Sequence, residues 1–285
     1  IVDQEERILV QLAGCPRNDE AWPGLMREVS AEMSSVASAT FSSTPQEIHA
    51  RGRHPTLCAG YSFGGGPKHP YTVNESHKQA AGRLIRFKGV GRIAGFQSSV
   101  MSLKAPRLFN HYKEVLSDIR QQDPSLHSPF PNSVFPTVTF NLGPQAVTFP
   151  HRDSKNVPYG WCAITALGDY DPTKGGHLYI WELKMVIEFP PGATILIPSA
   201  VFTHGNTPIQ AGETRQSITQ YCAGALIRWH RYGFRTESAM KRQDPELASR
   251  LQSGKHARWA EALQYFSKAS ELADDLRAHK RPRHK

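Results

Sequence analysis

The segment 149–161 of the chain, FPHRDSKNVPYGW, sets a histidine and an aspartate one residue apart, directly after an apolar run that ends at a proline. On a strand, side chains at positions i and i+2 point to the same face, so His151 and Asp153 could present an imidazole and a carboxylate to one centre. An isolated H-x-D pair is common by chance and equally suits two polar residues at the end of a strand. A metal site therefore requires a further ligand elsewhere in the chain.

His204 is the candidate for that ligand, because it follows a Pro-Pro-Gly turn, an apolar run and a short bend in PPGATILIPSAVFTH. Two histidines and one carboxylate form the facial triad that holds Fe(II) in oxygenases and leaves positions open for a cosubstrate and dioxygen. We predict that His151, Asp153 and His204 are metal ligands and catalytic residues.

Arg215 and Ser217, in the run TRQSITQY, are candidates for holding a cosubstrate. An oxygenase that uses 2-oxoglutarate needs a cation for the far carboxylate of that keto acid, and arginine binds carboxylates through two hydrogen bonds. Ser217 lies two residues further along the same strand face and adds a hydroxyl group. We therefore predict that Arg215, which is also counted as catalytic, and Ser217 bind 2-oxoglutarate.

Short β-rich runs separated by Gly, Pro, Asp and Asn surround these candidates between residues 134 and 232. The runs are VFPTVTFNL, AVTF, WCAITAL, HLYIWEL, MVIEF, ATILIP, RQSITQY and LIRWHRY. So many short strands at close spacing favour an antiparallel sandwich or jelly roll. We expect an α+β fold with a double-stranded β-helix core (jelly roll, cupin-like), flanked by N-terminal and C-terminal helices.

The remaining parts of the chain differ from this core. Helix-like apolar spacing occurs at 5–12, 24–37 and 106–120, and residues 244–278 suit one or two amphipathic helices. Residues 40–78 are rich in Gly, Pro and His and are expected to be irregular. Residues 83–103 alternate basic and apolar types, which predicts a half-buried strand pair. We expect one catalytic domain over 1–285, with an N-terminal part (1–130), the dioxygenase core (131–235) and a C-terminal helical part with a basic tail (236–285).

Composition indicates a soluble protein with an anionic partner. Of the 285 residues 39% are hydrophobic and 21% charged, and no run of about 18 apolar residues predicts a membrane span. The formal net charge of +9 favours a polyanion. Four scattered cysteines form no C-x-x-C pair, so neither a zinc site nor a disulfide framework is predicted. Candidate phosphate contacts are Arg83, Arg86, Lys88, Arg92, Lys104, Arg107, Arg152 and Lys155.

Two of the motifs resemble those of the TET/JBP family of Fe(II)- and 2-oxoglutarate-dependent nucleic-acid dioxygenases, especially its compact fungal members. HRDSKN is similar to the family's H-R-D-x-x-N, and RQSITQY is similar to its R-x-S-x-x-x-Y, within a match that spans residues 134–235. The resemblance implies Fe(II), 2-oxoglutarate and dioxygen as cofactors. It also implies oxidation of 5-methylcytosine in double-stranded DNA to 5-hydroxymethylcytosine and further products, with the target base flipped out of the duplex.

The resemblance also implies residues that contact the base. Asn156 would hydrogen-bond the flipped base and Tyr221 would pack against it, although a turn asparagine and a core tyrosine are open alternatives. Phe149 and Tyr159 flank the metal motif and are expected to stack on the base. Ala223 stands where animal members carry a histidine, and the cysteine-rich zinc region of those members is absent. Base identity therefore stays open, and oxidative demethylation of N6-methyladenine is the main alternative.

Other classes of function also fit parts of the pattern. A catalytically silent DNA-binding module, a hydroxylase of small molecules or proteins, and a zinc-loaded cupin are the alternatives. We further expect a monomer without membrane contact, and a nuclear location on the grounds of the DNA substrate and the basic tail.

Overall fold

The computed structural model describes residues 1–41, 51–73 and 75–280, so residues 281–285 of the basic tail and part of the expected irregular region lie outside the described residues. The strands are β1 (Gln11–Gly14), β2 (Thr56–Ser62), β3 (Tyr71–Thr72), β4 (Thr137–Asn141), β5 (Cys162–Asp169), β6 (Leu178–Ile180), β7 (Met185–Ile187), β8 (Thr194–Ile197), β9 (His204–Asn206) and β10 (Thr214–Tyr221). The helices are α1 (Trp22–Phe41), α2 (Lys78–Arg86), α3 (Lys88–Lys104), α4 (Pro106–Gln122), α5 (Gly224–Arg231), α6 (Glu237–Gln243), α7 (Pro245–Ser253), α8 (Arg258–Leu263) and α9 (Leu272–Lys280), with a 3₁₀ turn at Glu75–His77.

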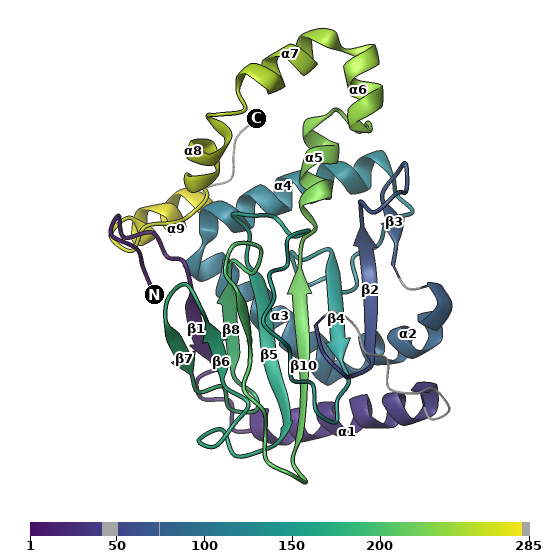
Figure 1. The fold of residues 1–285 in the computed structure, drawn as a ribbon, viewed down its shortest axis with the longest axis vertical. Helices are drawn as coiled ribbons and strands as arrows, with labels where there is room; N and C mark the ends of the chain where they lie inside the picture. The colour runs from purple at the N-terminus through teal and green to yellow at the C-terminus, as the bar shows by residue number, and fades with distance from the viewer. Residues whose placement is uncertain (42–50, 74, 281–285) are drawn as a thin grey trace.

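Two antiparallel sheets face each other and form the core (Figure 1). The larger sheet has the strand order β1-β8-β5-β10-β4-β2-β3, and the smaller has the order β7-β6-β9. The predicted α+β class with a sandwich core is confirmed. Strands β1 and β2 join the larger sheet although both come from the N-terminal part of the chain, so this part contributes to the core as well as covering it.

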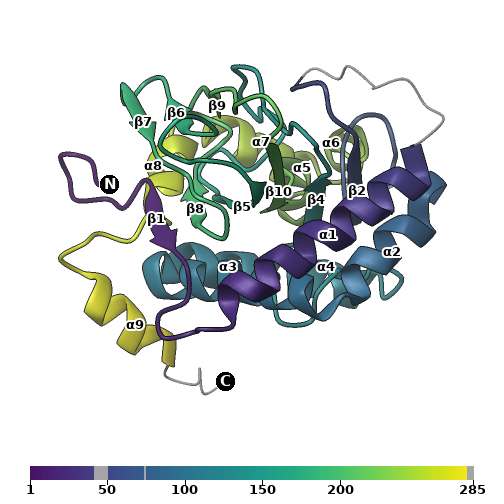
Figure 2. The same ribbon diagram turned by 90° about the horizontal axis from the view of Figure 1, so that it is seen from below.

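Helices α1 to α4 cover the outer face of the larger sheet (Figure 2). The layer between them is apolar, with Val29 of α1, Ile93 of α3 and Phe140 of β4 fully buried. The buried amide of Gln97 on α3 joins helix and sheet, because it donates to Thr165 Oγ1 (2.8 Å) and to the carbonyl of Ile218 (3.1 Å). This layer supports β5 and β10 from behind.

The prediction of a strand pair over 83–103 is wrong, because the segment forms α2 and α3. The buried residues Val90, Ile93, Ala94, Gln97 and Met101 recur at the spacing of one helix face. Gly89 allows close packing between two of the helices. A Cβ at Gly89 would lie 2.6 Å from Cγ2 of Val29, so α3 approaches α1 more closely than a side chain would permit.

Three shorter predictions also need correction. Residues 5–12 lead into the edge strand β1, and their burial alternates, with Ile8 and Val10 buried and Leu9 only half-buried. The expected strand LIRWHRY is α5, whose buried Leu226 and Trp229 are three residues apart. The run AVTF has one isolated bridge, at Thr148, rather than a strand. Part of the expected irregular region forms β2, which pairs with β4.

The helices predicted at 24–37 and 106–120 are confirmed as parts of α1 and α4. The C-terminal helices are more numerous than expected. Helices α5 to α8 form an arch that leaves the end of β10, and α9 lies beside the N-terminal segment (Figure 1). The chain there is fixed by a hydrogen bond from the Ile8 amide to the carbonyl of Ser267 (2.9 Å) and by ion pairs of Arg107 with Glu271 and Asp275. In the described part of the chain, every helix is too short or too polar to cross a membrane.

Replacing Gln97 by alanine should lower the free energy of unfolding by about 2–4 kcal/mol, because its buried partners on β5 and β10 lose their hydrogen bonds. Chemical denaturation measures this loss. Gln121→Ala on the exposed face of α4 is the matched control and should change the free energy by less than about 0.5 kcal/mol. Equal effects of the two substitutions would contradict the packing of α3 against the sheet.

Candidate metal centre and active site

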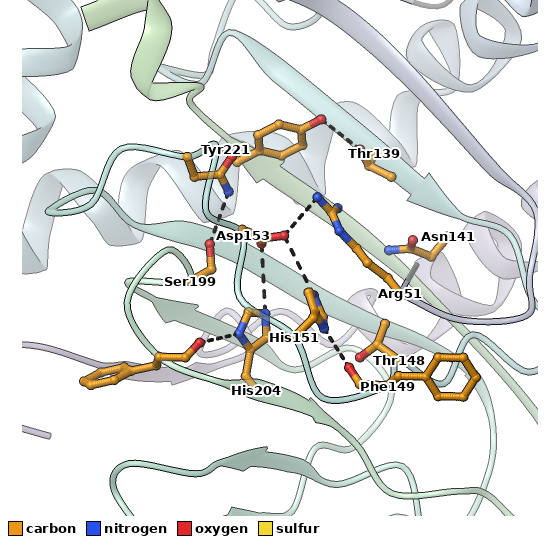
Figure 3. Close-up of polar contacts among 12 residues, drawn as sticks. Arg51, Thr139, Asn141, Thr148, Phe149, His151, Asp153, Ser199, His204 and Tyr221 are labelled. Atoms are coloured by element: carbon orange, nitrogen blue, oxygen red, sulfur yellow. Dashed lines mark hydrogen bonds and ion pairs between the residues drawn. The ribbon is translucent and has the colours of Figure 1, made fainter. Parts of the chain in front are cut away.

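The two histidines of the predicted triad are joined through their backbones. The amide of His151 donates to the carbonyl of His204, and the amide of His204 donates to the carbonyl of His151, both at 3.0 Å. The amide of Asp153 donates to the carbonyl of Ser199 (2.9 Å), which fixes the third residue beside the same segment. Residues that are about fifty positions apart in the sequence therefore converge at one place between the sheets (Figure 3).

Each triad residue offers one ligand atom, and these atoms all lie within 4.8 Å of one another. Asp153 Oδ1 is 3.8 Å from His151 Nε2, and Asp153 Oδ2 is 4.0 Å from His204 Nε2. Ligand atoms at about 2 Å from one metal ion lie roughly 3–4 Å apart, so small side-chain rotations bring all three onto one ion. In the described residues, this is the one group of His, Cys, Asp and Glu with such spacing.

Hydrogen bonds set the tautomers of both histidines. His151 Nδ1 lies 2.7 Å from the carbonyl oxygen of Phe149, and His204 Nδ1 lies 2.9 Å from that of Phe202. A carbonyl oxygen only accepts, so each Nδ1 carries the hydrogen and each Nε2 presents its lone pair to the centre. Burial lowers the pKa of His204, and the neighbouring His151 lowers it further. The neutral form that binds metals is therefore favoured.

Arg51 is a residue of this site that the sequence analysis missed. Its Nη2 lies 3.0 Å from Asp153 Oδ1, while half of its side chain is exposed. The neighbouring Gly52 forms a bridge with Thr148, and the carbonyl of Arg51 accepts a hydrogen bond from the amide of Phe149 (2.7 Å). This pairing brings Arg51 over the triad (Figure 3). No motif marks it in the sequence.

Arg215 lies deep in the same cavity, with 1% of its surface exposed. Its Nη1 donates to the carbonyl of Ala146 (2.5 Å), while its Nε has no hydrogen-bond partner among the described residues. The guanidinium carbon lies 5.8 Å from the centre of the Phe189 ring. Within the described residues no carboxylate pairs with this cation, and burial lowers its pKa. A buried cation without a counter-charge is costly, so the carboxylate of a ligand fits this position.

Strand β10 presents alternate residues to the cavity. Ser217 accepts a hydrogen bond from Asn141 Nδ2 (2.8 Å) and lines the cavity with Arg215. Gln216 and Gln220 lie on the opposite face of the strand and point to the helices. The amide of Gln216 donates to Ser34 of α1, and the amide of Gln220 donates to Gln97 of α3. Further polar lining residues that the sequence analysis missed are Thr139, Asn141, Thr148, Asn206 and Thr219.

The predicted base-contacting residues are only partly brought together. Asn156 and Tyr221 line the cavity; Asn156 donates to Ser199 Oγ (3.2 Å), and burial raises the pKa of Tyr221. Phe149 is 43% exposed, and its ring points away from the triad (Figure 3). The structure does not bring Tyr159 to the triad.

Tyr159 instead belongs to an aromatic cluster under the C-terminal arch. Its ring stacks on Tyr265 with centroids 4.9 Å apart, and its hydroxyl lies 2.9 Å from His111 Nε2. Burial lowers the pKa of His111 to about 4, so this histidine is neutral near neutral pH. The nearness of Tyr159 to the metal motif in sequence was misleading, because the chain turns away after Asn156.

The predicted phosphate contacts are also dispersed. Arg83 pairs with Glu32 (2.5 Å) and Arg92 pairs with Asp19, both in the helical layer behind the larger sheet. Arg152 pairs with Glu182 (2.6 Å) on the smaller sheet. Lys155, by contrast, is exposed and directly precedes the cavity residue Asn156.

No family model matches the sequence, and no curated protein matches it. Solved structures do share the fold. NgTET1 in complex with 5mC DNA aligns with a TM-score of 0.59 at 13% identity, over 78% of this chain and 74% of that chain. The chain has a double-stranded β-helix fold. A Pseudomonas putida prolyl-4-hydroxylase (TM-score 0.40, 13% identity, 77% and 94% covered) and a 2OG-Fe(II) oxygenase family oxidoreductase from Burkholderia pseudomallei (0.36, 16%, 73% and 93%) are more distant.

The predicted double-stranded β-helix is thereby confirmed, and its two sheets enclose the triad as well as Arg215. The donor set of two imidazoles and one carboxylate fits Fe(II), and the buried cation fits the far carboxylate of 2-oxoglutarate. Fold and triad together support the 2-oxoglutarate- and Fe(II)-dependent oxygenase class.

Substituting His204 by alanine should weaken binding of Fe(II), or of Co(II) as an air-stable probe, by at least about 100-fold, because one of three ligands is lost. Isothermal titration calorimetry on the full chain measures the affinity. His127→Ala, which removes an exposed histidine, is the matched control. Unchanged metal affinity in the His204 variant would contradict the assignment of the triad.

Proposed function

We propose that the protein is an Fe(II)- and 2-oxoglutarate-dependent dioxygenase that oxidises the methyl group of a methylated base in DNA, with 5-methylcytosine as the leading substrate. The observation that carries the proposal is the triad of His151, Asp153 and His204 in one cavity with the buried guanidinium of Arg215, which pairs with no carboxylate among the described residues. A module that only binds DNA has no need of a buried cation opposite three metal ligands.

Each residue of the cavity has a distinct role in this proposal. The triad would hold the metal, and Arg215 with Ser217 would hold the far carboxylate of 2-oxoglutarate. When bound, these cofactors supply the oxidising power that inserts one oxygen atom of dioxygen into a methyl C–H bond, while 2-oxoglutarate becomes succinate and carbon dioxide. The surrounding protein orients the substrate and limits the access of water. The backbone pairing of the two histidines keeps their lone pairs aimed at one point.

Three observations support a DNA base as the substrate. The chain carries a net charge of +9, which favours a polyanion. Asn156 and Tyr221 line the cavity that contains the triad, so it offers an amide and an aromatic ring as contacts for a planar base. NgTET1, whose structure contains 5mC DNA, shares the fold. The target base would have to leave the duplex to reach the triad, because the triad lines a cavity between the two sheets.

N6-methyladenine is the second candidate substrate. Ala223 forms an antiparallel bridge with Asn156, so a small side chain stands next to the predicted base-contacting amide. A pocket without an imidazole at this point has one hydrogen-bonding group fewer with which to exclude a purine. Oxidation of the N-methyl group would end in release of formaldehyde.

A panel of duplexes carrying 5-methylcytosine, N6-methyladenine or unmodified bases should separate these substrates. We expect oxidised cytosine products by mass spectrometry, with succinate formed in parallel. Asp153→Ala should abolish both products while DNA affinity is largely kept, whereas Asp274→Ala, which alters an exposed carboxylate, should leave both unchanged. If no methylated duplex gives an iron-dependent product, the proposed function is wrong.

Arg215→Lys should raise the KM for 2-oxoglutarate by roughly tenfold or more, because a lysine cannot form the two parallel hydrogen bonds of a guanidinium. Succinate formation at varied 2-oxoglutarate concentration measures this constant. Arg152→Lys is the matched control, since Arg152 follows a triad residue but pairs with Glu182 outside the cavity. An unchanged KM in the Arg215 variant would remove this residue from the 2-oxoglutarate site.

A further inference from the structure

A second recess lies under the C-terminal arch, outside the metal cavity. It has a volume of about 410 Å³ and is bounded by α5, α7, α8 and residues 157–159. Ligand pockets of proteins span roughly 300–1,000 Å³, so the recess is large enough for a ligand. Its floor includes the aromatic ring of Tyr159.

The walls of this recess carry four cations, which are Arg228, Arg231, Lys255 and Arg258. In the part of the chain that the structure describes, Arg231 alone among them pairs with a carboxylate, that of Glu261 at 3.2 Å. The nearby carboxylate of Glu237 is held by Lys241 (2.6 Å), which lowers its pKa most, while Arg228 and Arg258 lower that pKa less. The recess therefore has an excess of positive charge that its own acidic residues do not neutralise.

Trp259 lies among these cations, and 52% of its surface is exposed. The exposed indole therefore offers a flat apolar surface beside positively charged side chains. Flat aromatic surfaces combined with Lys and Arg are the elements by which proteins bind single-stranded nucleic acid, because bases stack on the ring and phosphates contact the cations.

The recess and the metal cavity share one wall. Asn156 lines the metal cavity, and the next residue, Val157, lines the recess. On the adjoining segment, Tyr221 lines the metal cavity and Gly224 lines the recess. A backbone bridge between Asn156 and Ala223 joins the two segments. Consecutive Cα atoms are about 3.8 Å apart, so little more than the backbone of these two segments separates the recess from the metal cavity.

We propose that this recess, lined by Arg228, Arg231, Lys255, Arg258 and Trp259, binds the DNA strand on one side of the target base. Phosphates contact the four cations, and one unpaired base stacks on Trp259. The inference rests on the proposed DNA substrate and assigns a surface to it. Nucleotides follow one another at about 3.4 Å along a stacked strand, so a strand whose target base enters the metal cavity reaches the recess within a few nucleotides.

The charge pattern favours a nucleic-acid strand over an acidic peptide. The lining combines four cations with apolar residues, two tyrosines and the indole of Trp259, which suits a ligand that carries both phosphates and planar bases. Exposed Lys155, next to the shared wall, extends the positive charge toward the metal cavity.

The test is DNA affinity by fluorescence anisotropy, with the full chain and a labelled, unmethylated duplex that has a single-stranded gap. No iron or 2-oxoglutarate is added. The variant Lys255→Ala with Arg258→Ala should weaken binding by roughly tenfold and reduce the slope of log affinity against log salt by about two. The matched control, Lys174→Ala with Arg277→Ala, changes the net charge equally but alters exposed, ion-paired residues outside the recess.

A separate variant, Trp259→Ala, should weaken binding to the gapped duplex several-fold and leave the salt slope unchanged, whereas Trp259→Phe should retain most of the affinity. Thermal melts followed by circular dichroism confirm that each variant is folded. Equal losses in the Lys255/Arg258 variant and its control would overturn the proposal, because only overall charge would then matter. Displacement of DNA by poly-glutamate at equal charge concentration would overturn it in favour of an acidic protein partner.

The outcome is separable from that of the proposed function, because binding is measured without turnover. If the recess variants lose DNA affinity while no methylated base is oxidised, the recess assignment stands and the proposed reaction fails. If methylated DNA is oxidised and the recess variants bind DNA as tightly as the unaltered protein, the recess assignment alone fails.

Discussion

The site depends on one pair of backbone hydrogen bonds, those that His151 and His204 exchange across two antiparallel segments. This pairing fixes both imidazoles at the same height between the sheets. The carbonyls of Phe149 and Phe202 then fix the orientation of each ring. Because the backbone supplies all four of these interactions, the placement of the two imidazoles relies on the main chain, while the carboxylate of Asp153 also contacts the side chain of Arg51. The site is thus organised before a metal arrives, which reduces the entropy lost on binding.

Arg215, by contrast, lowers the stability of the fold, because its positive charge is buried and pairs with no carboxylate among the described residues. The guanidinium is buried beside Phe189 and Tyr170, and its Nε lacks a partner among the described residues. The fold tolerates this cost through the apolar packing between the sheet and the helices behind it, where Phe140 of β4 and Ile218 of β10 are fully buried. Stability is therefore concentrated on one face of the larger sheet and chemical function on the other.

The sequence was informative where local spacing determines geometry. The H-x-D pair and the later His204 could be found because triad chemistry limits the choices, although residues 151–153 form one isolated bridge rather than the expected strand. Arg51 could not be found, because its position depends on the bridge between Gly52 and Thr148 rather than on any motif. Tyr159 was misplaced for a related reason, as nearness in sequence does not show where the chain turns. The helices α2 and α3 were missed because their basic and apolar residues alternate locally as they would on a half-buried strand, although the buried residues of α3 recur at helical spacing.

Each of the two faces of strand β10 has its own role. Arg215, Ser217 and Tyr221 face the cavity, while Gln216 and Gln220 anchor the helices. A slip by one residue would exchange these two sets, putting hydrocarbon and amide groups into the cavity and a guanidinium into an apolar layer. Such a strand has a single acceptable alignment. The cavity-facing positions of this strand are consequently the ones at which a side chain can be exchanged without disturbing the anchoring of the helices.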